Sequence, residues 1–405
     1  MGLRDRFRPK RRPEDAFADE VAELITDLLP VTSVERGPEF TLSVSFEDGR
    51  TSSVFLGMIY AEAMSLEGHE REERVRRAVL AMAPAPRPAT WADAEGRLLP
   101  AVRGMSWAAA AGGGEAQPLW RPFLPFLVLL AAIDADHGMS FVMPSDLRGW
   151  GVDADAVAAR ARENLVEGGM PVVQSDDRQW VEVSGPEGYV ASWLSVPDML
   201  GWLGADVFDG NFVAVAPSRD RLRLVSTADR ITLRHELERA LADYEAAPRQ
   251  LSPVPYAISE GEIAPWRPPP GDPCRPVVDR AGLVVAAVEY GFQQRTLASL
   301  FEKSGEDVFV AQLNAMERAD GSVWSWAAWV RQVTDGLLPR ADYVALIDNE
   351  ADTTFWVRWE DAERIVPGAL CQDAGYYPAR WRVAGWPEGS ALEELRAVAV
   401  PAPGR

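Results

Sequence analysis

Two adjacent side chains in this sequence could together recognise an anion. Arg219 and Asp220 follow Pro217 between two apolar runs. A guanidinium presents a fork of donors that matches the oxygens of a carboxylate or a phosphate. The neighbouring carboxylate would orient that group or act as a base, but an arginine beside it favours its charged form and so suits orientation better. The pair therefore indicates an anion site anchored by Arg219, with Asp220 beside it.

The same residues are also those that a tight turn requires. Pro217 lacks a backbone donor and presets φ for a turn. Ser218 and Asp220 form turns through side-chain hydrogen bonds to nearby amides. Leu222 and Leu224 then share one face of the following strand, because side chains alternate along a strand. Local sequence predicts a hairpin near the end of a sheet, and a solvated arginine at its tip is the more common outcome.

Other catalytic and metal-binding patterns are missing from the sequence. The three histidines stand far apart, and Arg239 occupies the place of the second histidine in a His-Glu-x-x-His motif. They are His69, His137 and His235. No Gly-x-Ser-x-Gly elbow supports a catalytic serine, and no glycine-rich phosphate loop is present. We therefore expect no metal, no cofactor and no catalytic residue.

One acidic run resembles a calcium loop in its spacing alone. Asp348, Glu350 and Asp352 place carboxylates at every second residue. Thr353 stands where such a loop requires glycine, and Trp359 stands where it requires a bidentate glutamate. We interpret these carboxylates as turn formers.

Tryptophan is concentrated late in the chain. Seven of the 15 tryptophans follow residue 276. Trp324 and Trp326 are two residues apart on a predicted strand and so face the same way. They could form an aromatic surface for a sugar or a peptide. Packing of a small sheet is the favoured interpretation, because large aromatic rings compensate for a limited core.

Proline marks the clearest boundary between the elements that would position these residues. Residues 252–276 contain eight prolines, which remove backbone donors and favour an extended linker over helix or sheet. We expect a basic flexible arm over 1–13, a mixed α+β domain over 14–251, and a smaller tryptophan-rich domain over 277–400. The last is predicted to be an antiparallel sheet with one or two helices. The predicted fold class is α+β in two domains, because neighbouring strands joined by short turns alternate with helices.

Several elements have clear local signals. Apolar spacing predicts a helix over 14–29, and alternation over 40–46 followed by Asp-Gly predicts a hairpin. Asp153 is expected to cap a helix, since its carboxylate can accept the free amides of a first turn. Ser390 is expected to cap the closing helix, with Glu393 at the capping-box spacing.

Charge and cysteine content limit the partners and the setting. The 405-residue chain has a net charge of −20, although its first 12 residues carry +5, which leaves −25 on the remainder. So acidic a body repels phosphate backbones, which argues against nucleic acid as the main partner. The basic arm could contact an acidic surface. Two cysteines far apart favour a reducing, cytoplasmic setting, and no apolar run reaches the length of a transmembrane segment.

Three short motifs carry a resemblance to a known family. "VAVAPSRDRLRLVSTAD", with the upstream "ARENLVEG" and "LLPAVRG", resembles the YtpQ-like family of bacterial proteins of unknown function. The matched positions are Asn164, Leu165, Pro217, Arg219, Asp220 and Leu222. The resemblance spans roughly residues 15 to 265 and does not cover the tryptophan-rich part. It implies a recurrent intracellular bacterial domain without an assigned reaction, and it adds Asn164 as a further polar contact for the Arg219 site.

Two functional hypotheses follow. The favoured one is a non-catalytic protein whose acidic body and aromatic C-terminal part bind another protein or a peptide. The alternative is a small-molecule-binding protein or an enzyme with its anion site at Arg219, Asp220 and Asn164. Convergence of these three residues in a pocket would favour the second hypothesis.

Overall fold

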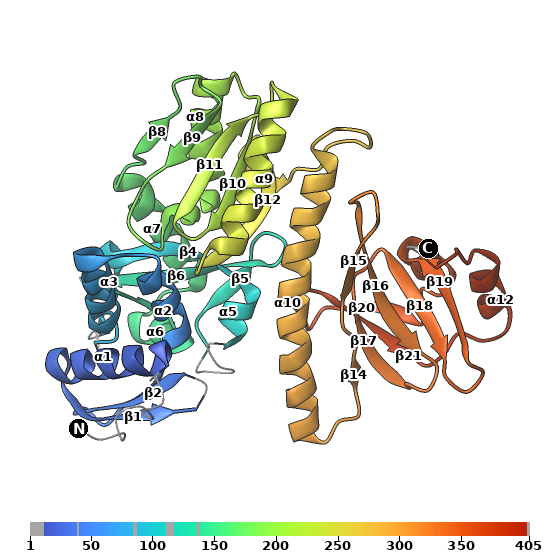
Figure 1. The fold of residues 1–405 in the computed structure, drawn as a ribbon, viewed down its shortest axis with the longest axis horizontal. Helices are drawn as coiled ribbons and strands as arrows, with labels where there is room; N and C mark the ends of the chain where they lie inside the picture. The colour runs from blue at the N-terminus through green and yellow to red at the C-terminus, as the bar shows by residue number, and fades with distance from the viewer. Residues whose placement is uncertain (1–11, 39, 84–86, 111–116, 136–137, 403–405) are drawn as a thin grey trace, which may run out of the picture. The chain divides into compact units, whose positions relative to one another are not determined.

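The computed structural model confirms the α+β class (Figure 1). It describes residues 12–38, 40–83, 87–110, 117–135 and 138–402. Most of the predicted basic arm, residues 1–11, lies outside the described residues, as does His137. The chain divides into two compact units, and the division does not follow the boundary expected at 252–276. The first unit is Met1–Leu98 with Ala132–Phe141 and Gly149–Val152, and the second is Leu99–Ala131, Val142–Arg148 and Asp153–Arg405.

The first unit is built on one helix packed on a small antiparallel sheet. The order of its three strands is β1-β2-β3, and the apolar residues of α1 meet those of β2 in one core. This confirms the helix and the hairpin expected near the N-terminus. The elements are α1 (Pro13–Leu28), β1 (Val31–Gly37), β2 (Thr41–Phe46), β3 (Thr51–Phe55), α2 (Leu56–Met64), α3 (Gly68–Leu80), α4 (Trp91–Ala94) and η2 (Glu95–Arg97).

A short antiparallel sheet and several helices follow in the chain. The strand order of the sheet is β4-β6-β5, with β7 paired to β6. Asp153 caps α7 as expected, because its carboxylate accepts the backbone N–H of Ala156. The elements are β4 (Leu98–Gly104), α5 (Met105–Ala110), β5 (Trp120–Pro122), β6 (Leu127–Ala135), β7 (Gly138–Phe141), α6 (Pro144–Trp150) and α7 (Ala154–Glu167).

The second unit contains a six-stranded antiparallel sheet in the order β13-β12-β10-β11-β9-β8. The predicted hairpin is confirmed as β10 and β11, which join through the two-residue turn at Arg219 and Asp220. Its expected place near the end of a sheet was wrong, because two further strands flank it on each side. Leu222 and Leu224 share one core, as expected from their alternation, while Val213 and Val215 pack beneath α9 on the other face. The elements are β8 (Val172–Gln174), β9 (Trp180–Val183), η4 (Val190–Ser195), α8 (Pro197–Phe208), β10 (Phe212–Ser218), β11 (Arg221–Ser226) and α9 (Arg230–Ala246).

The proline-rich segment is not the linker that the sequence indicated. Gln250–Ser259 forms β12, which lies between β10 and β13 (Glu262–Pro265). The register slips here, because Val215 pairs with Pro255 whereas Ala216 pairs with Ser252. A proline lacks the ladder donor and is tolerated where a bulge interrupts pairing. The expectation of no sheet was wrong because proline content does not reveal where the ladder is interrupted.

The C-terminal part differs from the predicted single antiparallel sheet with one or two helices, because its described residues form two four-stranded sheets and three helices, one of them long. The long helix is α10 (Arg275–Ser304), which spans 30 residues and starts with a proline in its first turn, where a missing N–H has no cost. The sheets have the orders β15-β16-β18-β19 and β14-β17-β21-β20. In addition to the antiparallel pairs that the sequence predicted, β16 pairs with β18 and β14 pairs with β17 in parallel.

Alternation decides which face of the first C-terminal sheet is buried. Ala327, Trp329, Val344 and Leu346 share one core with Trp359.

The closing helix, α12, is not capped by Ser390, because it starts at Gly389 and its N-cap residue makes no side-chain cap bond. The elements are β14 (Phe309–Val310), β15 (Asn314–Glu317), β16 (Val323–Val330), β17 (Asp335–Pro339), β18 (Tyr343–Asp348), β19 (Thr353–Arg358), α11 (Trp359–Ile365), β20 (Leu370–Asp373), β21 (Arg380–Ala384) and α12 (Gly389–Ala397).

Candidate functional site

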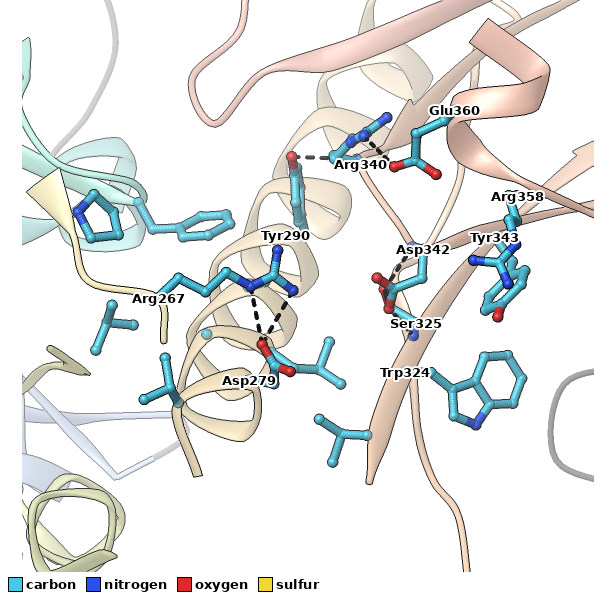
Figure 2. Close-up of a pocket in the computed structure, with 18 of the residues that line it drawn as sticks. Arg267, Asp279, Tyr290, Trp324, Ser325, Arg340, Asp342, Tyr343, Arg358 and Glu360 are labelled. Atoms are coloured by element: carbon cyan, nitrogen blue, oxygen red, sulfur yellow. Dashed lines mark hydrogen bonds and ion pairs between the residues drawn. The ribbon is translucent and has the colours of Figure 1, made fainter. Parts of the chain in front are cut away.

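A cleft of about 600 Å³ lies within the second unit, and we call it the α10 cleft (Figure 2). One wall is α10, another is the start of β16 and β18, and the segment around β13 adds a third. The polar and aromatic side chains labelled in Figure 2 are Arg267, Asp279, Tyr290, Trp324, Ser325, Arg340, Asp342, Tyr343, Arg358 and Glu360. A concave site of this volume suits a small molecule or a few residues of a peptide.

The α10 wall is a stripe of small and apolar residues. Val278, Gly282 and Ala286 line it at intervals of four residues, which places them on one face of the helix. A Cβ added at Gly282 would have no atom of the described residues within 4 Å, apart from nearby backbone of its own helix. The α10 wall of the cleft is therefore open at Gly282.

One ion pair at the cleft margin holds the β13 segment to α10. The Asp279 carboxylate accepts from Arg267 Nη2 at 3.2 Å and from Arg275 Nε at 2.7 Å. Arg275 stands one turn before Asp279 on the same helix, where opposite charges stabilise it. Both carboxylate oxygens of Asp279 thus already have donors from this protein.

A serine and an aspartate join the starts of the two parallel strands. The backbone N–H of Ser325 donates to Asp342 Oδ2 at 2.8 Å, and the Ser325 hydroxyl donates to the same oxygen at 2.8 Å. The hydroxyl in turn lies 3.0 Å from the Asp342 backbone N–H and can accept from it. No histidine is among the described residues that line the cleft. The pair is a closed hydrogen-bonded clamp between strands and lacks a base to activate the serine.

Arg340 and Tyr290 form the deep polar corner. Arg340 Nη2 lies 3.0 Å from Glu360 Oε1, and its guanidinium stacks 4.9 Å from the Trp359 ring. The Tyr290 hydroxyl donates to the Ala379 carbonyl at 2.9 Å, and burial raises the pKa of Tyr290. The dashed lines of Figure 2 show the contacts of Arg340 with Tyr290 and Glu360. Arg340 Nη1 has no hydrogen-bond partner among the described residues but lies 3.6 Å from the Glu363 carboxylate, with which it forms an ion pair.

The aromatic end of the cleft differs from the other walls. Trp324 lies 5.8 Å from Tyr343 and 6.0 Å from Trp356, edge to face, and Trp326 lies 5.1 Å from Trp356. Both predicted tryptophans therefore share a face, as their spacing indicated. That face is opposite the core of the sheet. Trp324 is buried and Trp326 is half-buried, so the first packs within the cluster and the second reaches the surface.

Two side-chain donors at this end have no acceptor among the described residues. Trp324 is 5% exposed, and its indole N–H has no hydrogen-bond partner in that part of the chain. The side chain of Arg358, the cross-strand neighbour of Tyr343, forms no hydrogen bond or ion pair with any described residue. Arg318 stacks 5.6 Å from the Trp324 ring and donates to the Ser322 hydroxyl at 3.3 Å.

The turn at Arg219 and Asp220 has a different environment. The backbone N–H of Gly188 donates to the Asp220 carboxylate, and Arg249 lies 3.9 Å from the same group. The Arg219 backbone is bonded on both sides, since its carbonyl accepts from Ala191 N–H at 3.0 Å and its N–H donates to the Arg249 carbonyl at 3.2 Å. The carboxylate holds a distant loop, a role that local turn chemistry did not predict.

A buried arginine lies behind this turn. Arg103 donates through Nη1 to the carbonyls of Val102 and Gly188, at 2.8 and 3.2 Å. Burial, together with the charge of nearby Arg219, lowers the pKa of Arg103 to about 9. Asn164 is half-buried on α7, where its carbonyl accepts from Gly168 N–H at the helix end. Arg219, Asp220 and Asn164 are not among the described residues that line the α10 cleft.

Comparison with models of known protein families, with curated proteins and with solved structures finds no match to this chain. The resemblance to the YtpQ-like family therefore remains a prediction. In the part of the chain that the structure describes, no three histidine, cysteine or acidic side chains are grouped so that they could hold a metal ion. Within the same residues, no helix combines the length and the apolar character needed to cross a bilayer.

Sequence reasoning found Trp324 and missed most of the polar cleft. Arg267, Asp279, Asp342 and Arg358 come from four segments that no short motif connects. The spacing of Val278, Gly282 and Ala286 on one helical face was an available signal for an open wall, since small residues permit close approach or leave space.

Proposed function

We propose that this protein is a non-catalytic, cytoplasmic binding protein that holds a peptide or a segment of another protein in the α10 cleft. The observation that carries the proposal is that donors without a partner among the described residues lie at one end of the cleft together with the rings of Trp324 and the half-buried Tyr343. Aromatic rings contribute large contact areas, and a few fixed polar groups set orientation.

The occupied polar groups of the cleft favour binding over catalysis. Ser325 and Asp342 bond to each other, and Asp279 and Glu360 bond to arginines. A nucleophile or a general base needs a free geometry toward its substrate and a matched partner. These side chains hold the walls of the cleft together, so we infer that they do not serve as a nucleophile or a general base.

The open position on α10 supplies a direct test. Gly282→Trp would fill the cleft from its α10 wall. Gly291→Trp changes the same helix at a position outside the cleft lining. Binding partners would be captured from cell extract by cross-linking and the contact sites located by mass spectrometry. We expect cross-links at the cleft for the wild type and for Gly291→Trp, and their loss for Gly282→Trp.

Circular dichroism of the two variants checks that both retain the fold. Equal capture by the wild type and a folded Gly282→Trp variant would contradict the proposal, because the bound segment would then lie elsewhere.

A further inference from the structure

We propose that the segment held in the α10 cleft is acidic, and that its carboxylates are bound by Arg358 and Arg318 beside Trp324. This inference rests on the proposed function and names the chemistry of its ligand. It follows from an imbalance between donors and acceptors in the cleft.

The acceptors of the cleft are already in use. The carboxylates of Asp279, Asp342 and Glu360 each accept hydrogen bonds from side chains or backbone of this protein. A ligand rich in donors, such as a lysine side chain, would have to displace one of these bonds. The charged hydrogen bonds that it broke would offset those that it made.

The unused groups of the aromatic end are donors. Arg358 ends β19 with its guanidinium in the cleft lining and no bond to any described residue. The Trp324 indole N–H also lacks an acceptor within the described part of the chain. Because Arg358 is exposed and pairs with no described carboxylate, a ligand carboxylate can reach its guanidinium without displacing an ion pair to a described residue.

Arg318 adds a second cation that forms no ion pair with a described carboxylate, although its charge interacts with that of Asp320. Its guanidinium lies over Trp324 and donates to Ser322 Oγ at 3.3 Å. The acid of the same turn, Asp320, accepts from the backbone N–H and the hydroxyl of Ser322 at 2.9 and 2.6 Å. Arg318 can therefore turn one edge of its fork toward a bound carboxylate without breaking an ion pair.

The arginine pairs elsewhere in the cleft show that this end is distinct. Arg267 is paired with Asp279 and Arg340 with Glu360, so their charges are compensated within the protein. Among the described residues, neither Arg358 nor Arg318 forms an ion pair, although Arg318 is close enough to Asp320 for their charges to interact. Acidic residues nevertheless outnumber basic ones in this chain, 61 to 41. At physiological ionic strength, charges beyond about 8 Å are largely screened, so a ligand at this end meets these two cations before the net charge of the whole chain.

The aromatic rings favour a peptide over a single small anion. The cluster continues from Trp324 through Trp356 to Trp326, along the same face of the sheet. Trp326 and Trp356 are half-buried and, although they are not among the described residues that line the cleft, they extend the cluster beyond Trp324. A chain of several residues can place carboxylates on the arginines and apolar atoms on these rings, whereas a free anion can use the arginines alone.

The test uses defined probes with the full-length protein. We would titrate a short capped peptide of alternating glutamate and alanine, its glutamine counterpart, its lysine counterpart, and inorganic phosphate. Calorimetry and tryptophan fluorescence would be read in parallel. We expect the glutamate peptide to bind, the glutamine and lysine peptides to bind at least about tenfold more weakly, and phosphate not to displace the glutamate peptide at equal concentration.

The paired variant Arg318→Gln with Arg358→Gln should weaken binding of the glutamate peptide by about tenfold or more. Arg295→Gln, an exposed substitution on α10 outside the lining, should leave it unchanged. Arg358 is exposed, so the variant should fold, and circular dichroism would confirm this.

Equal binding of the glutamine or lysine peptide would overturn the acidic-ligand inference and leave the proposed function standing. Displacement of the glutamate peptide by phosphate at equal concentration would show a site for small anions instead. Failure of every peptide overturns the inference too. The proposed function fails with it only if Gly282→Trp also leaves partner capture unchanged.

Discussion

The turn at Arg219 and Asp220 and the aromatic end of the α10 cleft both present arginine at a strand end, but their contacts differ. At the turn, Asp220 accepts from the Gly188 backbone, and Arg249 beside it pairs with Glu187 at 2.7 Å. At the cleft, Arg358 has no such partner among the described residues. Arginine, which could bind an anion, thus pairs with a carboxylate of the protein at the turn, whereas at the cleft Arg358 remains available to a ligand.

This difference separates two roles that look alike in sequence. A polar group with a complete set of partners should affect stability when it is changed. A polar group without partners should affect binding and leave stability almost unchanged. Substitutions at Arg380, Glu289 and Asp220 test the first part of this rule, and the paired Arg318→Gln and Arg358→Gln variant described above tests the second part.

Arg380 should show the largest effect on stability. It is fully buried and donates to Gln293 Oε1 at 2.7 Å and to the Ala311 and Leu337 carbonyls at 2.7 and 3.1 Å. Arg380→Met would leave these acceptors unpaired, so we expect the free energy of unfolding to fall by about 3–5 kcal/mol in urea titration.

Arg382, two residues further along β21, is the matched control. Its partners Asp335 and Asp373 are partly exposed, and Arg382→Met should cost under about 1 kcal/mol. Similar losses for the two variants would contradict the distinction between fully partnered buried groups and surface pairs.

Glu289 should make stability depend on pH. Burial raises the pKa of Glu289 from 4.5 to about 7, although the backbone N–H and the hydroxyl of Ser106 donate to it and lower the pKa. The fold therefore favours the protonated form, and this contribution is complete below pH 4.5 and lost as pH rises through 7. Relative to Glu289→Gln, the wild type should lose up to about 3 kcal/mol between pH 4.5 and 8.

Chemical denaturation across this pH range measures the effect. The exposed Glu302 on the same helix is the control, and Glu302→Gln should follow the wild-type profile. A constant difference between the wild type and Glu289→Gln at all pH values would show that the buried carboxyl does not titrate in this range.

Asp220 should have an intermediate effect that identifies it as part of the fold. Asp220→Ala removes the acceptor of the Gly188 N–H, and we expect a loss of about 1–2 kcal/mol in thermal or urea unfolding. Asp220→Asn keeps one acceptor oxygen and should recover part of this loss. Unchanged stability combined with lost binding of a small anion would instead support the alternative hypothesis of a ligand site at the turn.

Gly282 should have the smallest effect, and of opposite sign. The residue lies within α10, and a Cβ at this position meets open space. Gly282→Ala should raise the free energy of unfolding by about 0.5–1 kcal/mol, because alanine loses less backbone entropy in a helix. A loss of stability on this substitution would mean that other atoms occupy the space beside Gly282 in solution.

The sequence by itself determined the elements whose signals are local. The helix at 13–28, the hairpin at 41–55 and the Asp153 cap follow from periodicity, turn residues and one side chain next to free amides. The β10–β11 hairpin was predicted for the same reason. These features depend on residues only a few positions apart, so the sequence alone is sufficient to predict them.

Only the tertiary structure decided which polar side chains remain available. β12 joined the sheet despite its prolines because the register shift leaves Pro253 outside the ladder, whereas Pro255 stays opposite Val215. Asp220 met an amide 32 residues away, whereas Arg358 met no partner in the described residues. Whether a donor has an acceptor depends on which distant segments tertiary packing brings together, and no local sequence pattern predicts this.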